Sequence, residues 1–142
     1  MSHAPLLKFN FTYDNRFGVP LIPITFFHKD GVRAQLLNNA ILDSGAYEIT
    51  IPKALADMLG LELRPRSNPV HTAGGLIEAC TATIDFTLGR GGRFVQYTNV
   101  DICVMKQCPA VLIGIHPIFE DYTMTIMAHQ RKCILEPKEN RL

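Results

Sequence analysis

The sequence lacks a long apolar run and a strong net charge. No apolar stretch in its 142 residues approaches the roughly 20 residues that a membrane-spanning helix needs. Fourteen basic side chains stand against 13 acidic ones, so no global electrostatic field attracts nucleic acid or an anionic membrane. The first residues lack both the basic start and the apolar run of a signal peptide. We therefore expect a cytoplasmic protein that binds neither nucleic acid nor membrane.

The sequence also has little that favours serine, cysteine or metal chemistry. None of its three serines lies in the G-x-S-x-G turn of serine hydrolases. No local signature pairs one of the four cysteines with a histidine, and residue alternation places Cys80 on an apolar strand face. Cys103, Cys108 and His116 are loosely spaced and no C-x-x-C pair follows, which disfavours a zinc site. We expect no metal and no cofactor.

Short strand patterns dominate what is present. Apolar and polar residues alternate over residues 7–13 and 76–88, as in half-buried strands. Further strand patterns lie at 21–27, 32–36, 40–42, 94–104, 110–113, 123–128 and 132–135. We expect the 94–104 strand to bend near Thr98 and Asn99. Pro52 opens a helical pattern of about two turns that ends at Gly60, and a second short helix fits 117–122. The sequence predicts one mostly-β domain, a barrel or a sandwich.

One carboxylate stands out, at the end of the short apolar strand 40–42. Asp43, Ser44, Gly45 and Ala46 follow that strand directly. Gly45 permits a sharp turn that directs backbone N–H groups toward the carboxylate. Such a turn is either a structural one, with Asp43 capping its own backbone, or the setting of a catalytic acid.

Two later elements favour catalysis. Residues 71–75, HTAGG, lie between two strand patterns and predict a glycine-tipped hairpin. Residues 110–114, AVLIG, precede Pro117 and predict a strand, a glycine and a short helix. In this order, the three elements resemble the retropepsin-like aspartic proteases, a retroviral-type, single-domain family. The resemblance covers residues 21–135.

This resemblance implies a fold and a domain plan. The fold is a closed, mostly-β acid-protease barrel of short strands, with a flap hairpin and one or two short helices. The domain spans residues 21–135, after an N-terminal extension or strand at 1–20 and before a flexible tail at 136–142. The N-terminal segment is a dimerising strand, a lid or a piece removed by self-cleavage.

The resemblance also implies an aspartic endopeptidase activity. The chain has one Asp-Ser-Gly and no Asp-Thr-Gly, so two copies must form a symmetric homodimer to pair two carboxylates. Asp43, Ser44 and Gly45 would be catalytic. The residues expected to bind an extended peptide substrate are Ala46, Tyr47, Thr72, Ala73, Gly74, Gly75 and Ile113. Residues 6–13 and 132–135 are candidate dimer strands.

The sequence departs from the retroviral pattern at one ion pair. Retroviral enzymes carry an Asp directly after D-T-G-A and an Arg directly after the later glycine, whereas this chain has Tyr47 and Ile115. We expect apolar contacts to brace the loop instead. The alternative function is a non-catalytic retropepsin-like β-barrel that serves as a peptide-binding or dimerisation module.

Overall fold

Strands make up most of the chain, as the alternating patterns predict. The computed structural model describes residues 6–13, 18–66, 68–72 and 74–138. In chain order, its elements are β1 (Phe9–Thr12), β2 (Leu21–Phe27), β3 (Ala34–Leu42), β4 (Thr50–Pro52), α1 (Lys53–Met58), β5 (Arg64–Pro65), β6 (Val70–Thr72), β7 (Gly75–Ile77), β8 (Ala79–Arg90), β9 (Arg93–Met105), β10 (Leu112–Ile113), α2 (Ile118–Asp121), β11 (Tyr122–Met127), the 3-10 turn η1 (Ala128–Gln130) and β12 (Lys132–Pro137). The mostly-β fold class is therefore confirmed. In the described part of the chain, no helix has the length and apolarity that a bilayer crossing requires.

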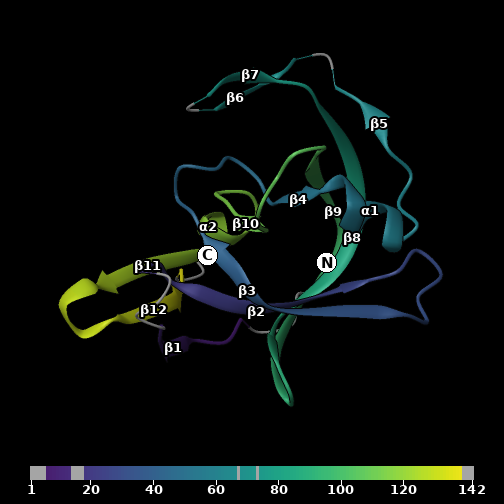
Figure 1. Cartoon of the computed structure of the whole chain (residues 1–142). Helices are drawn as coiled ribbons and strands as arrows, with labels where there is room; N and C mark the ends of the chain where they lie inside the picture. The colour runs from purple at the N-terminus through teal and green to yellow at the C-terminus, as the bar shows by residue number, and fades with distance from the viewer. Residues whose placement is uncertain (1–5, 14–17, 67, 73, 139–142) are drawn as a thin grey trace.

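Six strands close into a barrel because β2 pairs along both of its edges. The strand order is β2-β3-β10-β4-β9-β8, and β2 also pairs with β8, which joins the two ends (Figure 1). β5 adds to β8 outside this ring. Apolar side chains fill the interior, and burying each such side chain stabilises the fold by roughly 1.5–3 kcal/mol. The fully buried ones include Ile22, Ile24, Phe26, Ile51, Phe86, Leu88, Ile102 and Ile113.

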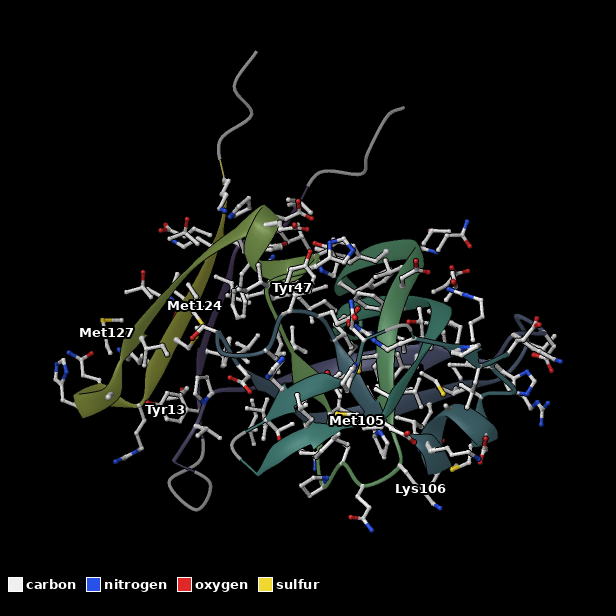
Figure 2. All side chains as sticks on the ribbon, turned by 90° about the horizontal axis from the view of Figure 1, so that it is seen from above. Tyr13, Tyr47, Met105, Lys106, Met124 and Met127 are labelled. Carbon is white, nitrogen blue, oxygen red and sulfur yellow. The ribbon has the colours of Figure 1, made fainter. Side chains whose placement is uncertain are left out.

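A second sheet, at one edge of the molecule, combines the first strand, β1, with the last two strands, β11 and β12. Its order is β1-β12-β11, so β12 has both edges paired within the chain, and β1 and β11 are the outer strands. Met124 and Met127 lie on β11 at this edge (Figure 2). The hydroxyl of Tyr122 donates to the carbonyl oxygen of Leu7 at 2.8 Å. Residues 132–135, expected as a dimer strand, are thus already paired on both sides.

The alternation patterns located most strands but misjudged three boundaries. β3 is one continuous strand rather than two, because its hydrogen bonds to β2 continue past the exposed Leu36. The expected strand 76–88 is interrupted at Glu78 and divides into β7 and β8. Glu136 and Pro137 belong to β12, paired with Thr123 and Tyr122. These two residues, expected in a flexible tail, are therefore part of a paired strand, and residues 139–142 lie outside the described chain.

The expected bend in β9 has a clear local cause. Asn99 adopts a positive φ of 54°, a backbone conformation that Asn tolerates better than most residues. Its N–H donates to Oδ1 of Asp85 at 2.7 Å. The β8–β9 register shifts between Ile84 and Phe86, opposite this point. The bend predicted near Asn99 is therefore confirmed.

Candidate active site

Asp43 lies directly after β3, where that strand runs parallel to β10. Leu112 and Ile113 of β10 pair with Ile41 and Leu42. The ladder continues for one more step, because the N–H of Asp43 donates to the carbonyl oxygen of Ile113 at 2.9 Å. The side chain of Asp43 is half-buried. A barrel strand and its parallel neighbour thus fix the backbone of the candidate catalytic acid.

The turn after Asp43 fixes the direction of its carboxylate. The N–H of Gly45 donates to Oδ1 of Asp43 at 2.9 Å, and the N–H of Ala46 donates to the Asp43 carbonyl oxygen at 3.1 Å. A β-carbon on Gly45 would stand only 3.2 Å from Oδ1. Gly45 thus allows the close approach, while Ser44 is exposed beside the carboxylate. This contact also occurs in simple Asx turns, so the neighbouring elements must distinguish the two interpretations.

The strand–glycine element at residues 110–114 packs directly on this turn. A β-carbon on Gly114 would stand 2.5 Å from the carbonyl oxygen of Ala46 and 2.7 Å from that of Glu48. The N–H of Ile115 donates to the Ala46 carbonyl oxygen at 2.9 Å, and the N–H of His116 donates to that of Tyr47 at 2.6 Å. Two of the three elements singled out in the sequence therefore form one unit. A simple Asx turn would not require this second glycine.

An ion pair that the sequence pattern did not predict lies beside the candidate catalytic loop, residues 43–49. Tyr47 is 69% exposed and Ile115 is 40% exposed, so neither side chain is buried in an apolar core. Instead, Oε1 of Glu48 lies 2.5 Å from Nη1 of Arg66, with side-chain exposures of 14% and 25%. The only sequence signal was an acidic residue directly after the D-S-G-A-Y run. Its partner is 18 residues away, at no spacing that a helix or a strand would suggest.

The third element is a hairpin made by β6 and β7. These strands pair antiparallel through Val70–Ile77, His71–Leu76 and Thr72–Gly75, and this two-stranded sheet stands above the barrel in Figure 1. The Thr72 hydroxyl donates to the carbonyl oxygen of Gly75 at 2.8 Å and accepts the N–H of Gly74 at 3.2 Å. Gly74 and Gly75 are exposed and Thr72 is half-buried. Ala73, also expected to bind substrate, lies outside the described residues.

The two residues of β10 face opposite ways. Ile113 is fully buried, so the chain offers none of its surface to a substrate. Leu112 is half-buried and pairs with Ile41, and paired residues project to the same face of a sheet. Side chains alternate along a strand, so Asp43, two residues after Ile41, lies on that same face. Leu112, rather than Ile113, therefore lies on the same face of the sheet as Asp43.

The thiols and the imidazole considered for a zinc site have other contacts. Cys103 is buried, and this burial raises the pKa of its thiol. Sγ of Cys108 donates to the carbonyl oxygen of Ala110 at 2.8 Å. Nδ1 of His116 lies 2.5 Å from a carboxylate oxygen of Glu120. Across residues 6–138, where the structure describes them, no three His, Cys, Asp or Glu side chains group to hold a metal.

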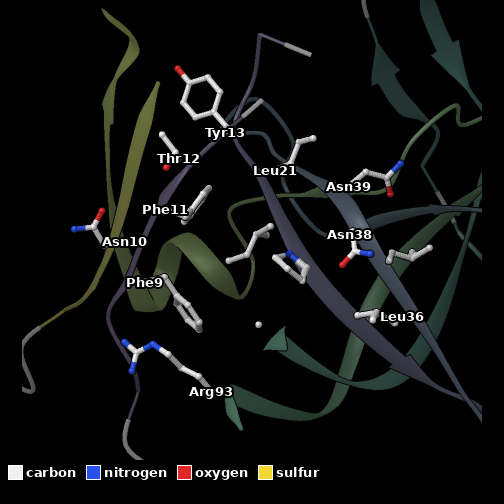
Figure 3. A pocket seen from close by; sticks show the side chains of 14 residues that line it. Phe9, Asn10, Phe11, Thr12, Tyr13, Leu21, Leu36, Asn38, Asn39 and Arg93 are labelled. Carbon is white, nitrogen blue, oxygen red and sulfur yellow. The ribbon is translucent and has the colours of Figure 1, made fainter. Parts of the chain in front are cut away.

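A cavity of about 840 Å³ lies away from the candidate site. It is lined mainly by residues of β1, β2 and β3, with Arg93 at one end (Figure 3). The Arg93 guanidinium lies 5.9 Å from the centre of the Phe9 ring and donates to the carbonyl oxygen of Lys8. Asp43 and the hairpin do not line this cavity. It is therefore separate from the carboxylate.

Two solved proteases have a similar fold. A retropepsin-like aspartic protease from Rickettsia conorii matches with a TM-score of 0.61 and 18% identity, over 95% of this chain and 96% of that chain. The EIAV protease in complex with the inhibitor HBY-793 matches with a TM-score of 0.51 and 16% identity, over 76% of this chain and 92% of that chain. At these identities the likeness is one of fold. No curated protein sequence matches the chain significantly.

A sequence-family model gives the more direct assignment. The model described as "gag-polyprotein putative aspartyl protease" matches residues 35–118. This match covers more than half of the chain and includes Asp43, the hairpin and β10. The chain therefore belongs to the gag-polyprotein aspartyl protease family and has a retropepsin-like fold.

Proposed function

We propose that the protein is an aspartic endopeptidase that is active as a symmetric homodimer. The observation that carries this proposal is the position of Asp43, which follows β3, accepts the N–H of Gly45 and leads into a loop whose backbone packs against Gly114. The family assignment supports the same chemistry. Because each chain has one Asp-Ser-Gly, the active site needs Asp43 from both copies.

The chemistry follows from bringing two carboxyl groups together. At a separation of about 3 Å, they cannot both ionise and so they share one proton. The ionised Asp43 removes a proton from a water molecule, whose oxygen attacks the scissile carbonyl carbon. The neutral Asp43 gives its proton to the carbonyl oxygen, which forms a tetrahedral diol. The diol collapses as the C–N bond breaks: the leaving nitrogen takes the proton that the first Asp43 removed from water, and a diol hydroxyl returns a proton to the second Asp43. Ser44 would hydrogen-bond across the two-fold axis and keep the carboxyl groups coplanar.

Two features on one side of the molecule support a dimer. In Figure 1, the segment between β3 and β4 and the β1-β12-β11 sheet both lie toward the left. A second copy facing that side would bring its own Asp43 toward the first. Since β12 is paired on both edges, β1 and β11 are the strands left to add across the interface.

The proposed substrate is an extended peptide that binds between the hairpin and the catalytic loop. A peptide in this conformation pairs its main chain with neighbouring backbone and places alternate side chains in pockets. Ala46, Tyr47 and Leu112 would line those pockets, and Tyr47 already exposes most of its ring. The hairpin, with Thr72, Gly74 and Gly75 near its turn, would act as a flap that closes over the peptide and excludes water.

A cytoplasmic location is part of the proposal. All four cysteines lie in the described chain and all four are free thiols, which suits a reducing compartment. Cys133 is fully buried, and burial raises the pKa of its thiol to about 11. A thiol protonated at neutral pH is a poor nucleophile, so Cys133 would take no part in the chemistry.

The second candidate function is a peptide-binding or dimerisation barrel without hydrolysis. The exposed Tyr47 and Ile115, which stand where retroviral enzymes have an ion pair, favour this alternative. A cleavage assay separates the two functions. The wild-type protein should cleave a library of unstructured peptides, and a statine-type inhibitor should stop the cleavage. Asp43→Asn should abolish cleavage while the circular dichroism spectrum and the dimer stay unchanged.

The result of this assay decides between the functions. Peptide binding without any cleavage would support the module and contradict the enzyme. Cleavage at the wild-type rate by Asp43→Asn would show that this carboxylate is not catalytic.

A further inference from the structure

The ion pair between Glu48 and Arg66 joins two parts of the candidate site that are separate in the sequence. Glu48 belongs to the catalytic loop, where its carbonyl oxygen lies against Gly114. Arg66 follows β5 directly, in the segment that leads into the β6–β7 hairpin. Their 2.5 Å contact is largely shielded from water, and charge-assisted hydrogen bonds of this kind are roughly twice as strong as neutral ones.

Arg66 also lies at the root of the hairpin. Its Nη1 is 3.5 Å from the hydroxyl of Thr81 on β8, the strand that leaves the hairpin. β5 pairs with β8 through Arg64–Thr81 and Pro65–Cys80. Arg66 therefore stands where the chain departs from the barrel and where it returns, so a single guanidinium contacts the loop and the returning strand.

Little else in the described chain fixes the hairpin against the barrel. β6 and β7 pair only with each other, and Leu76 is 61% exposed. A cavity of about 530 Å³ lies beside the hairpin root. Its lining includes Arg66, Pro69, Glu78, Lys53 of α1 and Val104 of β9. Since apolar packing does not fill this space, the position of the root depends on polar contacts.

We propose that the Glu48–Arg66 ion pair is a positioning device that holds the hairpin root at a fixed place relative to Asp43. This inference rests on the proposed peptidase function. Glu48 and Arg66 are positioning residues, because they act on the substrate through the hairpin and the loop. Without the ion pair, the root of the hairpin is free to move into the neighbouring cavity. The hairpin then closes over a peptide less often and less accurately.

A nearby arginine, which lies in β5 itself, provides a matched control. Arg64 is two residues before Arg66, and its guanidinium lies 3.2 Å from Asp101. Both of these side chains are largely exposed, at 47% and 62%, and the pair does not include the catalytic loop. Arg64→Gln therefore removes an arginine and an ion pair only two residues from Arg66 without releasing the loop.

The experiment compares amide hydrogen exchange and peptide-cleavage kinetics in Glu48→Gln, Arg66→Gln and Arg64→Gln. In the first two variants, the amides of Leu76 and Ile77 should exchange about tenfold faster, and kcat/KM should fall by about tenfold, mostly through a higher KM. Arg64→Gln should change neither quantity. Arg66→Lys keeps the charge but loses the planar guanidinium. Its hairpin exchange and its kcat/KM should therefore lie between those of the wild type and those of Arg66→Gln.

Two results would overturn the proposal. One is unchanged hairpin exchange in Arg66→Gln. The other is an increase in exchange at core amides such as Ile84 and Ile102 that matches the increase in the hairpin, because the pair would then stabilise the whole fold. Hydrogen exchange is measured without substrate, so it tests the positioning role even if the wild-type protein cleaves no peptide. An inactive wild type with the expected exchange pattern would contradict the proposed function alone.

Discussion

Gly114 and Ala46 are in direct backbone contact, with space for no side chain between them. A β-carbon on Gly114 would stand 2.5 Å from the Ala46 carbonyl oxygen and 2.8 Å from its carbonyl carbon. Both atoms belong to the main chain of the loop that carries Asp43, so neither moves without moving that loop. The glycine of the β10 element therefore determines how closely β10 approaches the turn that carries Asp43.

Gly114→Ala should abolish the proposed peptidase activity. The added methyl group pushes the loop away, which we expect to destabilise the fold by about 1–3 kcal/mol and to lower kcat by about 100-fold or more. Thermal melting and a peptide-cleavage assay measure the two effects. Gly92→Ala is the control, because a β-carbon at Gly92 would meet nothing within 4 Å. Full activity in Gly114→Ala would mean that the loop position does not matter for catalysis.

Specific activity should rise with protein concentration. If one Asp43 from each chain forms the site, monomers are inactive, and dilution below the dimer dissociation constant lowers activity per chain. Sedimentation velocity at the assay concentrations should show activity following the dimer fraction. A chain that remains monomeric at high micromolar concentration and still cleaves peptides would contradict the shared site.

Gly74→Val should weaken substrate closure while leaving the fold intact. A β-carbon at Gly74 would meet only the Thr72 hydroxyl, at 3.8 Å, so the substitution is sterically tolerated. The branched side chain restricts the backbone near the hairpin turn and reduces the space for a peptide. We expect KM to rise and kcat to fall together.

An inhibitor should protect the hairpin amides of the wild type from exchange. A hairpin that is equally protected with and without a bound inhibitor does not act as a flap.

Tyr122→Phe should loosen the N-terminal segment. The substitution removes the donor to the Leu7 carbonyl oxygen, which we expect to cost about 1 kcal/mol of stability at neutral pH. Limited proteolysis before β1 should become faster, and a chemical-denaturation series should give the loss in free energy. An unchanged proteolysis rate would show that this hydrogen bond does not hold the segment.

Alkaline titration tests the same hydroxyl in a second way. Burial raises the pKa of Tyr122 from 10.0 to about 12, so the folded state favours the neutral phenol. The stabilisation is fully present below pH 10, the unfolded value, and is lost as the pH rises through about 12. Phenylalanine does not ionise. The advantage of the wild type over Tyr122→Phe in unfolding free energy should therefore shrink over this range and then reverse, because a shift of two pKa units corresponds to about 2.7 kcal/mol. A constant difference would contradict the raised pKa.

The sequence revealed features that depend on local patterns. The apolar run before Asp43, the glycines at the hairpin turn and the alternation in β8 each report on a few neighbouring residues. Burial and turn geometry act at this range, so these elements were found where they were expected. The same holds for the bend at Asn99, whose positive φ suits its residue type.

Contacts between distant segments were not predictable in this way. The Glu48–Arg66 pair and the central position of β12 depend on how the chain closes in space. The two-residue strand β10 shows a second limit, because both of its residues are apolar and alternation does not distinguish a buried Ile113 from a half-buried Leu112. Only the parallel pairing with β3 settles which of them faces the side of Asp43.

The distance between the two Asp43 carboxyl groups in a crystal structure of the dimer tests the central claim most directly. The account predicts that the carboxyl oxygens of the two copies lie about 3 Å apart on the two-fold axis, close enough to share one proton. A dimer in which the two carboxyl groups face solvent, each out of hydrogen-bonding reach of the other, would contradict the aspartic peptidase mechanism and favour the non-catalytic barrel.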